Sequence, residues 1–566
     1  MAGGRFPRGS ESDTMRVSAL IAEITTISEN HDRLDSQLIV DLNYKVNGMA
    51  DEQISAQLVM LDTSDNVAVA RTNIAADTPL TWFDDKFKAV DSVPAGHKIA
   101  VRPVKQGAAV TKYGQIIGQA TSDIRPGQHV HSHNLAIVDV HADYAACSQI
   151  PDPPTPITDR TFQGYVRDNG KVGTRNYLAV ISTVNCSASA AKFIAQRFPP
   201  EELAKYPNID GVIAFKHEAG CAMQYQGDAH HTLNRLMAGI ARHPNVGGFL
   251  LVGLGCETGA MGYLLQEQNL VQIEGVGGAD RPGPLVLSMQ DMGGTLKTVE
   301  AGIAQITKML PQVNDIQRQT VSASHLSVGL ECGGSDGNSG VTANPALGIA
   351  SDRIVACGGT AILSETSEVY GAEHLLTRRA VTPEVADKLA ERIEWWKHYV
   401  SLFGAQLDNN PSPGNKAGGL TTIAEKSLGA VAKAGSTALV DVYGYGEPVE
   451  AKGLVFMDTP GYDPASVTGM VAGGANVVCF TTGRGSCFGC KPTPSIKIAT
   501  NTPMYDRMIA DMDVNAGSVL EGESITSAGE RIFEEILSVA SGKQTKSEQQ
   551  NIGDEEFVPW LVGPTL

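Results

Sequence analysis

The sequence predicts an α/β fold, in which a small N-terminal β-rich module precedes a large α/β body with mainly parallel sheets. Between residues 59 and 134, short β-type runs are separated by Gly, Pro and Asp turns, which is typical of a compact all-β unit. After residue 160, continuous apolar runs alternate with helical patterns, as expected for parallel strands buried on both faces. Four prolines at 151–156 form a stiff, extended spacer between the two regions.

These patterns divide the chain into five parts. Residues 1–57 have no clear period, and we expect an N-terminal extension that is partly flexible. The β-rich module follows at 58–136, and the Pro-rich linker occupies 137–160. The body is then expected to comprise an α/β domain at 161–400 and a C-terminal α/β domain at 401–566.

The expected strands of the body end in loops that contain Gly, Cys or polar residues. The strand-like runs lie at 177–184, 211–217, 248–255, 327–334, 437–445, 453–460, 475–485 and 496–502. Helical patterns lie at 188–198, 230–243, 383–407 and 528–543. The helix at 383–407 begins with Pro383 and has Glu384 in its first turn, which is typical of a helix N-terminus.

The composition argues against several classes of partner. The net charge of −18 disfavours nucleic acid and anionic membrane, because a polyanion gains nothing from an acidic surface. Local basic residues can still bind an anionic small substrate. No run reaches the length of a membrane span, and the first 15 residues lack the apolar core of a secretory signal. The nine cysteines are odd in number and scattered, which favours reduced thiols and a cytoplasmic location.

Cysteines follow four of the expected strands. Cys186, Cys221, Cys256 and Cys332 each stand in a loop after an apolar run. If the strands are neighbours, these thiols converge, because ligands bind beyond the carboxyl ends of parallel strands. Thiolates ligate iron, zinc or an iron–sulfur cluster, whereas a small thiol also simply fits a tight Gly-rich turn. His217, four residues before Cys221, is a candidate for acid–base chemistry.

Three further loops suit an anionic, hydroxylated substrate. The loop at 410–419 carries Asn415 and Lys416, the loop at 481–485 carries Thr482 and Arg484, and hydroxyl and amide groups follow at 500–502. A guanidinium binds a carboxylate bidentately. Ser335 and Asp336, after Cys332, add polar groups. One such loop is an ordinary turn, but three in one domain favour a polar site.

Histidines and one further cysteine pair complete the candidates. His129, His131 and His133 alternate, so a strand would place all three side chains on one face, either as metal ligands or as a polar edge. Cys487 and Cys490 form a CxxC, but prolines follow it and no second pair matches it, which argues against a redox or zinc site.

With these motifs the sequence resembles the altronate dehydratase/galactarate dehydratase family over nearly its whole length. The matching motifs are GHK (96–98), KYG (112–114), GTRN (173–176), GLGCE (253–257), CGGSD (332–336), SGVTANP (339–345), NPSPGNKAGG (410–419), TTGRG (481–485) and ATNT (499–502). The resemblance implies an N-terminal SAF-type module and a large dehydratase body. HVHSHN (129–134) and FMDTPGYD (456–463) resemble the altronate side of the family. The extension at 1–57 and the CxxC depart from its pattern.

The resemblance implies removal of water from a sugar acid, most favourably D-altronate, to give 2-keto-3-deoxy-D-gluconate. Galactarate is the alternative substrate. A sulfolactate-type lyase and a non-catalytic binder of carbohydrate acids are further alternatives, and a homo-oligomer is one candidate assembly. Iron dependence is implied as well, as Fe²⁺ or as an iron–sulfur cluster, with Mn²⁺ as a substitute. The candidate ligands are Cys186, Cys221 and Cys256, with His97, His131 and His133 as the competing set.

Roles follow for the remaining candidates. His217 is the leading acid–base residue, and Glu365 is a second general base. Lys416 and Arg484 are expected to bind the substrate carboxylate. Asn415 and Thr482 are expected to bind its hydroxyls, together with Ser335 and Asp336.

Overall fold

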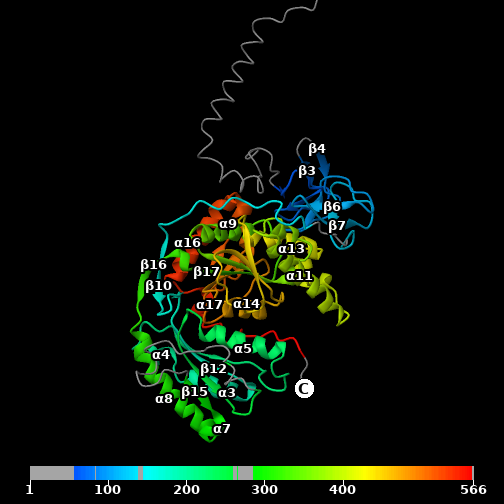
Figure 1. Cartoon of the computed structure of the whole chain (residues 1–566). Helices are drawn as coiled ribbons and strands as arrows, with labels where there is room; N and C mark the ends of the chain where they lie inside the picture. Colours follow the sequence, from blue (N-terminus) through cyan, green and yellow to red (C-terminus); the bar gives the residue numbers. More distant parts are fainter. Residues whose placement is uncertain (1–56, 83–84, 138–143, 259–263, 265–284, 564–566) are drawn as a thin grey trace, which may run out of the picture. The chain divides into compact units, whose positions relative to one another are not determined.

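The computed structural model describes residues 57–82, 85–137, 144–258, 264 and 285–563, all within one compact unit, residues 54–566. It confirms the predicted fold class, because a strand-rich N-terminal module precedes an α/β body whose main sheet has seven parallel strands (Figure 1). Among the described residues, no helix combines the length and the apolar character that crossing a bilayer requires.

The strands of the β-rich module are short and antiparallel. One sheet has the order β1-β2-β5-β8, a second has the order β6-β7-β9, and β3 pairs with β4. The strands are β1 (Leu58–Val59), β2 (Val67–Ala70), β3 (Pro79–Trp82), β4 (Asp85–Lys88), β5 (Lys98–Ala100), β6 (Ala109–Lys112), β7 (Gln115–Ala120), β8 (His129–Val130) and β9 (Leu135–Ala136). Successive residues of β2 face different cores: Ala68 lies in the module's own cluster, whereas Val67 lies in the large cluster shared with the body. The module is therefore packed on the body through apolar side chains.

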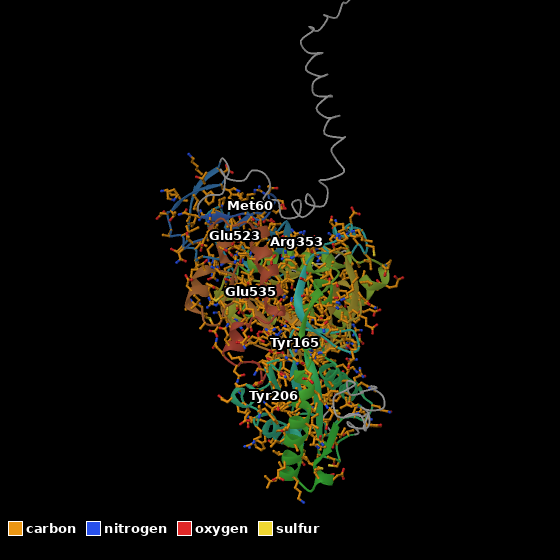
Figure 2. The ribbon with its side chains drawn as sticks, turned by 90° about the vertical axis from the view of Figure 1, so that its left-hand side faces the viewer. Met60, Tyr165, Tyr206, Arg353, Glu523 and Glu535 are labelled. Atoms are coloured by element: carbon orange, nitrogen blue, oxygen red, sulfur yellow. The ribbon has the colours of Figure 1, made fainter. Side chains whose placement is uncertain are left out.

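The linker is extended along the body. Three of its amides donate to body carbonyls: Cys147 to Thr377 (3.1 Å), Gln149 to Arg378 (2.8 Å) and Ile157 to Ala356 (2.9 Å). A small antiparallel sheet then begins the body, with β10 (Thr161–Val166) between β11 (Val172–Gly173) and β16 (Arg318–Ser322). On β10, the ring of Tyr165, labelled in Figure 2, lies 4.5 Å from the Arg318 guanidinium.

A four-stranded parallel sheet follows, with the order β13-β12-β14-β15. Its strands are β12 (Tyr177–Ser182), β13 (Gly211–Phe215), β14 (Val246–Gly253) and β15 (Leu285–Ser288), and its helices are α3 (Asn185–Ala195), α4 (Pro200–Leu203), α5 (Asp228–Ala241), α7 (Met289–Met292) and α8 (Thr295–Asn314). Leu178 and Val180 of β12 pack towards α3 and α8, whereas Ala179 and Ile181 pack with α5 residues. Both faces are covered, as the continuous apolar runs predict.

The main sheet has the order β19-β20-β18-β17-β21-β22-β23. Its strands are β17 (Ser327–Cys332), β18 (Thr360–Leu363), β19 (Leu439–Tyr443), β20 (Gly453–Met457), β21 (Val477–Thr482), β22 (Ser495–Ala499) and β23 (Val514–Asn515). Its helices are α9 (Ala343–Ala356), α10 (His374–Thr377), α11 (Pro383–Ser401), α12 (Pro413–Ala417), α13 (Ile423–Val431), α14 (Asp463–Ala472), α15 (Thr502–Arg507), α16 (Ile525–Ala540) and α17 (Lys546–Gln549). Leu363 packs with α9 and α16, whereas Ile362 packs with α14 (Figure 1).

Strands from both sides of residue 400 hydrogen-bond in this one sheet. β18 lies between β17 and β20, although β20 follows the expected boundary at 400/401. That boundary falls inside α11, so the sheet does not divide there. Hydrophobic periodicity identifies strands but does not say which strands are neighbours.

Candidate active site

Polar loops meet at the carboxyl edge of the main sheet. They follow β17, β21 and β22, and Asp336 holds them together. Its carboxylate accepts hydrogen bonds from the hydroxyls of Ser339 (3.1 Å) and Thr500 (3.0 Å) and from the amide of Asn501 (3.2 Å). Burial raises the pKa of Asp336, while these hydrogen bonds oppose the rise. Both of its oxygens are therefore engaged by the protein, and Asp336 positions the loops.

Two predicted cations lie beside this junction. Lys416 is half-buried and Arg484 is exposed, and in the described part of the chain neither side chain pairs with a carboxylate. Arg484 lies against the loop that carries Lys416. A Cβ built on Gly418, in that loop, would come 3.3 Å from the Cδ of Arg484. Two unpaired cations on adjoining loops are suited to bind a carboxylate from solution.

Asn415, Ser335 and Thr482 lie at the same junction. The amide of Asn415 donates to the Ser335 carbonyl at 2.8 Å, and the Thr482 hydroxyl accepts from the Gly485 amide at 3.1 Å. The Ser335 hydroxyl is buried and has no hydrogen-bond partner among the described residues. Of the four residues predicted to bind substrate hydroxyls, Ser335 is the one whose side chain is left without a hydrogen-bond partner among the described residues.

Histidines of the β-rich module contact the loop that carries Lys416. The Nε2 atoms of His97 and His131 bond to the carbonyls of Ala417 (3.3 Å) and Lys416 (2.9 Å). The rings of His97, His129 and His131 lie 5.2–5.4 Å apart, and His133 lies 5.5 Å from His129. Burial lowers the pKa of His97 and of His129 to about 4. The imidazoles of His97 and His129 are therefore neutral at neutral pH.

A buried ion triad joins the module to the body. Lys98 and Lys112, which belong to the GHK and KYG motifs, donate to the two carboxylate oxygens of Glu425 at 2.8 and 2.9 Å, and all three side chains are almost completely buried. Burial would raise the pKa of Glu425, but the two lysines outweigh burial and lower it to about 2. Sequence reasoning assigned no role to this triad, although two lysines inside specific motifs of an acidic protein were a signal for it.

Tyr113 follows Lys112 in a backbone conformation that is rare for a residue with a side chain. Its φ is 63°, and its amide donates to the Asp65 carboxylate at 3.0 Å. Its hydroxyl passes between two glycines, since a Cβ on Gly340 would lie 2.4 Å from it and one on Gly429 would lie 3.7 Å away. Such strain at a non-glycine residue is typical of a functional position.

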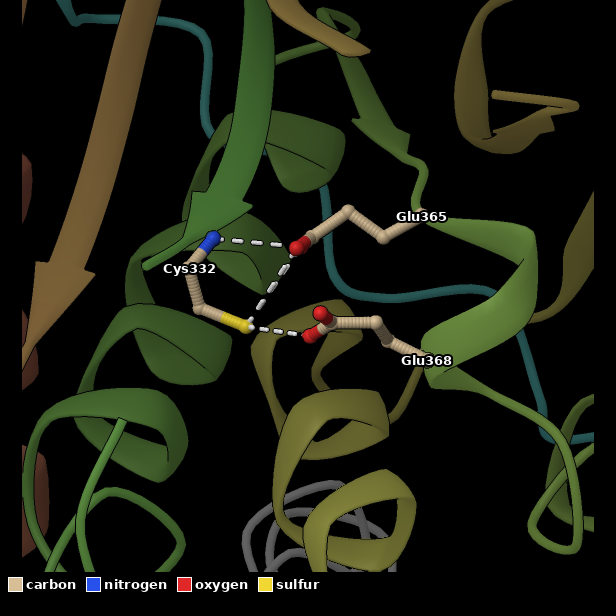
Figure 3. A group of neighbouring side chains, drawn as sticks. All are labelled: Cys332, Glu365 and Glu368. Carbon is tan, nitrogen blue, oxygen red and sulfur yellow. Dashed lines mark hydrogen bonds between the residues drawn. The ribbon is translucent and has the colours of Figure 1, made fainter. Parts of the chain in front are cut away.

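A second buried cluster lies directly below the loops. The thiol of Cys332 lies 3.4 Å from a carboxylate oxygen of Glu365 and 3.8 Å from one of Glu368 (Figure 3). Lys433 pairs with Glu365, and Lys426 pairs with Glu368 at 2.6 Å. Burial raises the pKa of Glu365 to about 7, against the effect of Lys433. Sequence reasoning identified Cys332 and Glu365 but missed Glu368, Lys426 and Lys433, which only packing brings together.

A cavity of about 10 Å³ lies between the polar loops and the second buried cluster. It is lined by Tyr113, Cys332, Ser335, Asp336, Ser339, Gly340, Asn344, Leu420, Glu425, Lys426, Gly429 and Ala430. That volume holds about one water molecule. In the described conformation this cavity is therefore too small for a sugar acid.

Three family models match consecutive parts of the chain. They are the altronate/galactarate dehydratase SAF domain (residues 56–137), the D-galactarate dehydratase/altronate hydrolase second domain (164–314) and the D-galactarate/altronate dehydratase C-terminal domain (323–565). The altronate dehydratase of Bacillus subtilis is 36% identical over 514 residues, which cover 90% of this chain and 99% of that protein. The chain belongs to the altronate/galactarate dehydratase family.

Two further relatives show how this family varies. The galactarate dehydratase (L-threo-forming) of Escherichia coli is 37% identical over 514 residues, 89% of this chain and 97% of that protein. The (2R)-sulfolactate sulfo-lyase of Chromohalobacter salexigens matches in two subunits. Its subunit beta is 31% identical over 403 residues, 70% of this chain and 97% of the subunit. Its subunit alpha is 36% identical over 89 residues, 14% of this chain and 95% of the subunit.

The remaining predicted site residues lie in loops that follow strands of the four-stranded sheet. Cys186, Cys221 and Cys256 follow β12, β13 and β14, and all three are exposed. Cys332 lies on the main sheet, so the expected convergence of four thiols is wrong: three share one sheet edge, because β17 pairs with strands of the other sheet.

His217 is buried beside the same edge. Its Nε2 donates to the Ser182 carbonyl at 2.9 Å, and its Nδ1 accepts from the Ala219 amide at 3.1 Å. Burial lowers its pKa to about 4. The geometry therefore holds this ring in place and leaves neither nitrogen free for a substrate proton. Of the CxxC, Cys487 is exposed and Cys490 is buried.

Proposed function

We propose that this dehydratase removes water from D-altronate to give 2-keto-3-deoxy-D-gluconate. The observation that carries the proposal is the pair of unpaired cations, Lys416 and Arg484, at the carboxyl edge of the main sheet in a member of this family. The similarity to an altronate dehydratase over 90% of the chain supports the substrate. Galactarate is the second candidate, because the galactarate dehydratase is equally similar.

The reaction needs a base for the C2 proton and assistance for the departing C3 hydroxyl. Lys416 and Arg484 would bind the carboxylate, and the Ser335 hydroxyl would bind a substrate hydroxyl. Glu365 is the proposed base in preference to His217, because its pKa of about 7 suits proton transfer near neutral pH. The enol formed by loss of water then ketonises without further help.

Two sets of residues were expected to hold iron, or manganese in its place, and the structure adds a third, the group of Cys332, Glu365 and Glu368. The carboxylates of Glu365 and Glu368, beside Cys332, already pair with lysines. His97 and His131 direct ring nitrogens at backbone carbonyls. The thiols of Cys186, Cys221 and Cys256 are exposed and, among the described residues, have no hydrogen-bond partner, so they are free to bind iron. Their sulfurs do not all lie within 4.8 Å of one another, as the ligand atoms of Cys332, Glu365 and Glu368 do. Iron bound by these thiols would supply a Lewis acid at the edge of the four-stranded sheet, which is a different sheet from the one whose loops carry Lys416 and Arg484.

The nine cysteines are all free thiols, which supports our proposal of a cytoplasmic enzyme. Its partner in this proposal is the small sugar acid, and a homo-oligomer stays a prediction.

Lys416→Ala tests the proposed clamp. Loss of a carboxylate-positioning cation is expected to lower turnover of altronate about 100-fold. The melting temperature should stay within about 1 °C, because the lysine has no ion-pair partner among the described residues. Release of 2-keto acid from altronate, galactarate and sulfolactate is the measurement, and Lys397→Ala on the outer face of α11 is the control. Wild-type turnover by Lys416→Ala would remove Lys416 from the site, and wild-type release from sulfolactate alone would overturn the proposed substrate.

A further inference from the structure

The loop between β20 and α14 brings a further carboxylate to the candidate site. It belongs to the FMDTPGYD motif, which ends with Asp463, the first residue of α14. A Cβ built on Gly333, in the CGGSD loop after β17, would lie 2.3 Å from the Oδ2 atom of Asp463. A side chain at residue 333 would therefore displace this carboxylate, and glycine allows it to lie directly against the CGGSD loop.

The next residue of the CGGSD loop lies beside Arg484. A Cβ on Gly334 would come 3.5 Å from the Cβ of Arg484, and a Cβ on Gly418 would come 3.3 Å from its Cδ. The Arg484 side chain thus extends from the CGGSD loop towards the loop that carries Lys416. Two adjacent glycines therefore have an anionic side chain beside one of them and a cationic side chain beside the other.

The NPSPGNKAGG loop extends between these two places. At its start, the side-chain amide of Asn410 donates to a carboxylate oxygen of Glu368 at 2.7 Å. Glu368 lies against the FMDTPGYD motif, because a Cβ on Gly461 would come 2.9 Å from its Cγ. At its end, Gly418 approaches Arg484. A linear sugar acid lying along this loop would present its two ends to different groups.

Asp463 has no countercharge. The two lysines of the buried cluster pair with other carboxylates, Lys433 with Glu365 and Lys426 with Glu368 at 2.6 Å. In the part of the chain that the structure describes, no cation forms an ion pair with Asp463, and its side chain accepts a hydrogen bond only from its own amide. Its negative charge is therefore left for a ligand to meet.

The surroundings of Asp463 give a ligand access to it. The residue is half-buried, and Tyr462 before it is 61% exposed. Burial and the nearby Glu368 raise the pKa of Asp463 to about 6, so this carboxyl is mainly ionised at neutral pH. In the same CGGSD loop, the Ser335 hydroxyl is buried and has no hydrogen-bond partner among the described residues. Both groups therefore have hydrogen-bonding capacity that a bound sugar acid can satisfy.

We propose that Asp463 selects sugar acids whose carbon 6 carries a hydroxyl over those whose carbon 6 is a carboxylate. With the C1 carboxylate held by Lys416 and Arg484, Asp463 would accept a hydrogen bond from the C6 hydroxyl of an aldonate. It would repel the second carboxylate of an aldarate, and two ionised carboxylates have no proton to share. The inference rests on the proposed function for the position of the C1 carboxylate and adds the class of substrate.

The test compares D-altronate with D-altrarate, which differs from it only in having a carboxylate at carbon 6. Release of 2-keto acid by the full-length protein gives kcat/KM for each acid. Isothermal titration calorimetry with the 3-deoxy derivatives of both acids, which have no C3 hydroxyl to lose, gives Kd without turnover. Circular dichroism and melting temperature check that each variant is folded.

Asp463→Asn removes the charge and keeps the shape of the side chain. Glu384→Gln is the matched control, because it also removes an acidic residue from the first turn of a helix, the exposed N-terminus of α11. Wild type and Glu384→Gln should prefer the aldonate by about 10-fold or more in both kcat/KM and Kd. Asp463→Asn should lose most of this preference, because it accepts the aldarate better.

Equal use of the two acids by wild type, an unchanged preference in Asp463→Asn, or an equal loss in Glu384→Gln would overturn the inference. Turnover of altronate with any of these results would leave the proposed function standing. A preference in binding that Asp463→Asn loses, without turnover of either acid, would support the inference and overturn the proposed function.

Discussion

Glu425 joins the module to the body through two buried ion pairs, with Lys98 and Lys112. Lys98 also donates to the Gly419 carbonyl at 2.7 Å, and Thr421 donates to Glu425 from its amide (3.0 Å) and its hydroxyl (2.6 Å). Two lysines from one part of the chain thus share a single carboxylate from another. A buried charge without its partner is far more costly than an exposed one.

Glu425→Gln is therefore expected to destabilise the protein by about 3–5 kcal/mol, because it leaves Lys98 and Lys112 buried without a countercharge. Denaturant unfolding at neutral pH measures the loss. Asp123→Asn, which breaks the exposed Lys105–Asp123 pair, is the control and should cost under about 1 kcal/mol. Similar losses for the two variants would contradict the role given to the triad.

His243 makes stability depend on pH. Its Nε2 donates to the Ala475 carbonyl at 2.9 Å, and burial lowers its pKa from 6.5 to about 3. Between these values the unfolded chain binds a proton that the folded chain does not. Stability should therefore fall as the pH falls below 6.5, by at most about 1.4 kcal/mol per pH unit from this residue.

Comparing wild type with His243→Gln in denaturant at neutral pH and at about pH 5 checks this effect. The difference in unfolding free energy should shrink at the lower pH, because the variant lacks the titrating ring. The exposed His398→Gln serves as the control. A difference that does not change with pH would show that His243 contributes nothing to acid sensitivity.

At the scale of elements, the KYG turn fits between the approach to α9 and the helix α13. Gly340 precedes α9, Gly429 lies in α13, and the Tyr113 hydroxyl lies between them. Gly340 and Gly429 approach so closely that a Cβ on Gly340 would lie 2.8 Å from Gly429 Cα. Side chains at these positions would push the turn out of the site.

Gly340→Ala is expected to cost about 1–3 kcal/mol through overpacking and to lower turnover by displacing Tyr113. Gly414→Ala is the matched control, since its nearest neighbour would be 3.7 Å away. Melting temperature and altronate turnover measure the two effects. Equal behaviour of the two variants would show that Tyr113 has room to move.

The elements were largely predictable, and their pairing was not. Apolar runs at 177–184 and 475–485 predicted β12 and β21, and the polar loops at 410–419 and 481–485 do meet. A strand that is buried on both faces can be recognised in the sequence as a continuous apolar run. The choice of neighbouring strands does not, which is why Cys332 was grouped with three thiols of another sheet.

The candidate site was predictable only where its residues stand together with other polar residues in one loop. Lys416 and Arg484 stand in polar loops that can be recognised in the sequence. Glu425 lies 327 residues from its partner Lys98, and its position in a helix gives no sign of that ion pair. Ion pairs across such separations arise from tertiary packing and leave no local period.

At the scale of the whole molecule, contacts outside the linker also hold the module to the body. The apolar cluster that contains Val67, Ala100 and Val130 continues into β17 and α9. The sulfo-lyase relative matches this chain in two separate subunits, one over 403 residues and one over 89 residues. The interface should therefore persist when the chain is cut.

A protease site inserted among the prolines at 151–156 tests this. After cleavage, the two fragments should elute together and keep altronate turnover, because the triad and the shared core remain. The same cut in Glu425→Gln should release the module. Separation of the fragments in the otherwise wild-type protein would show that the tether is required.

The small size of the cavity, about 10 Å³, has a kinetic consequence. A sugar acid is many times larger than one water molecule, so a substrate held by the exposed Arg484 and the half-buried Lys416 can enter this cavity only when the loops around it part. Association that depends on such an opening falls below the usual range of about 10⁵–10⁷ M⁻¹s⁻¹. An inhibitor that resembles the enol should then show slow onset and slow release, even when its final affinity is high.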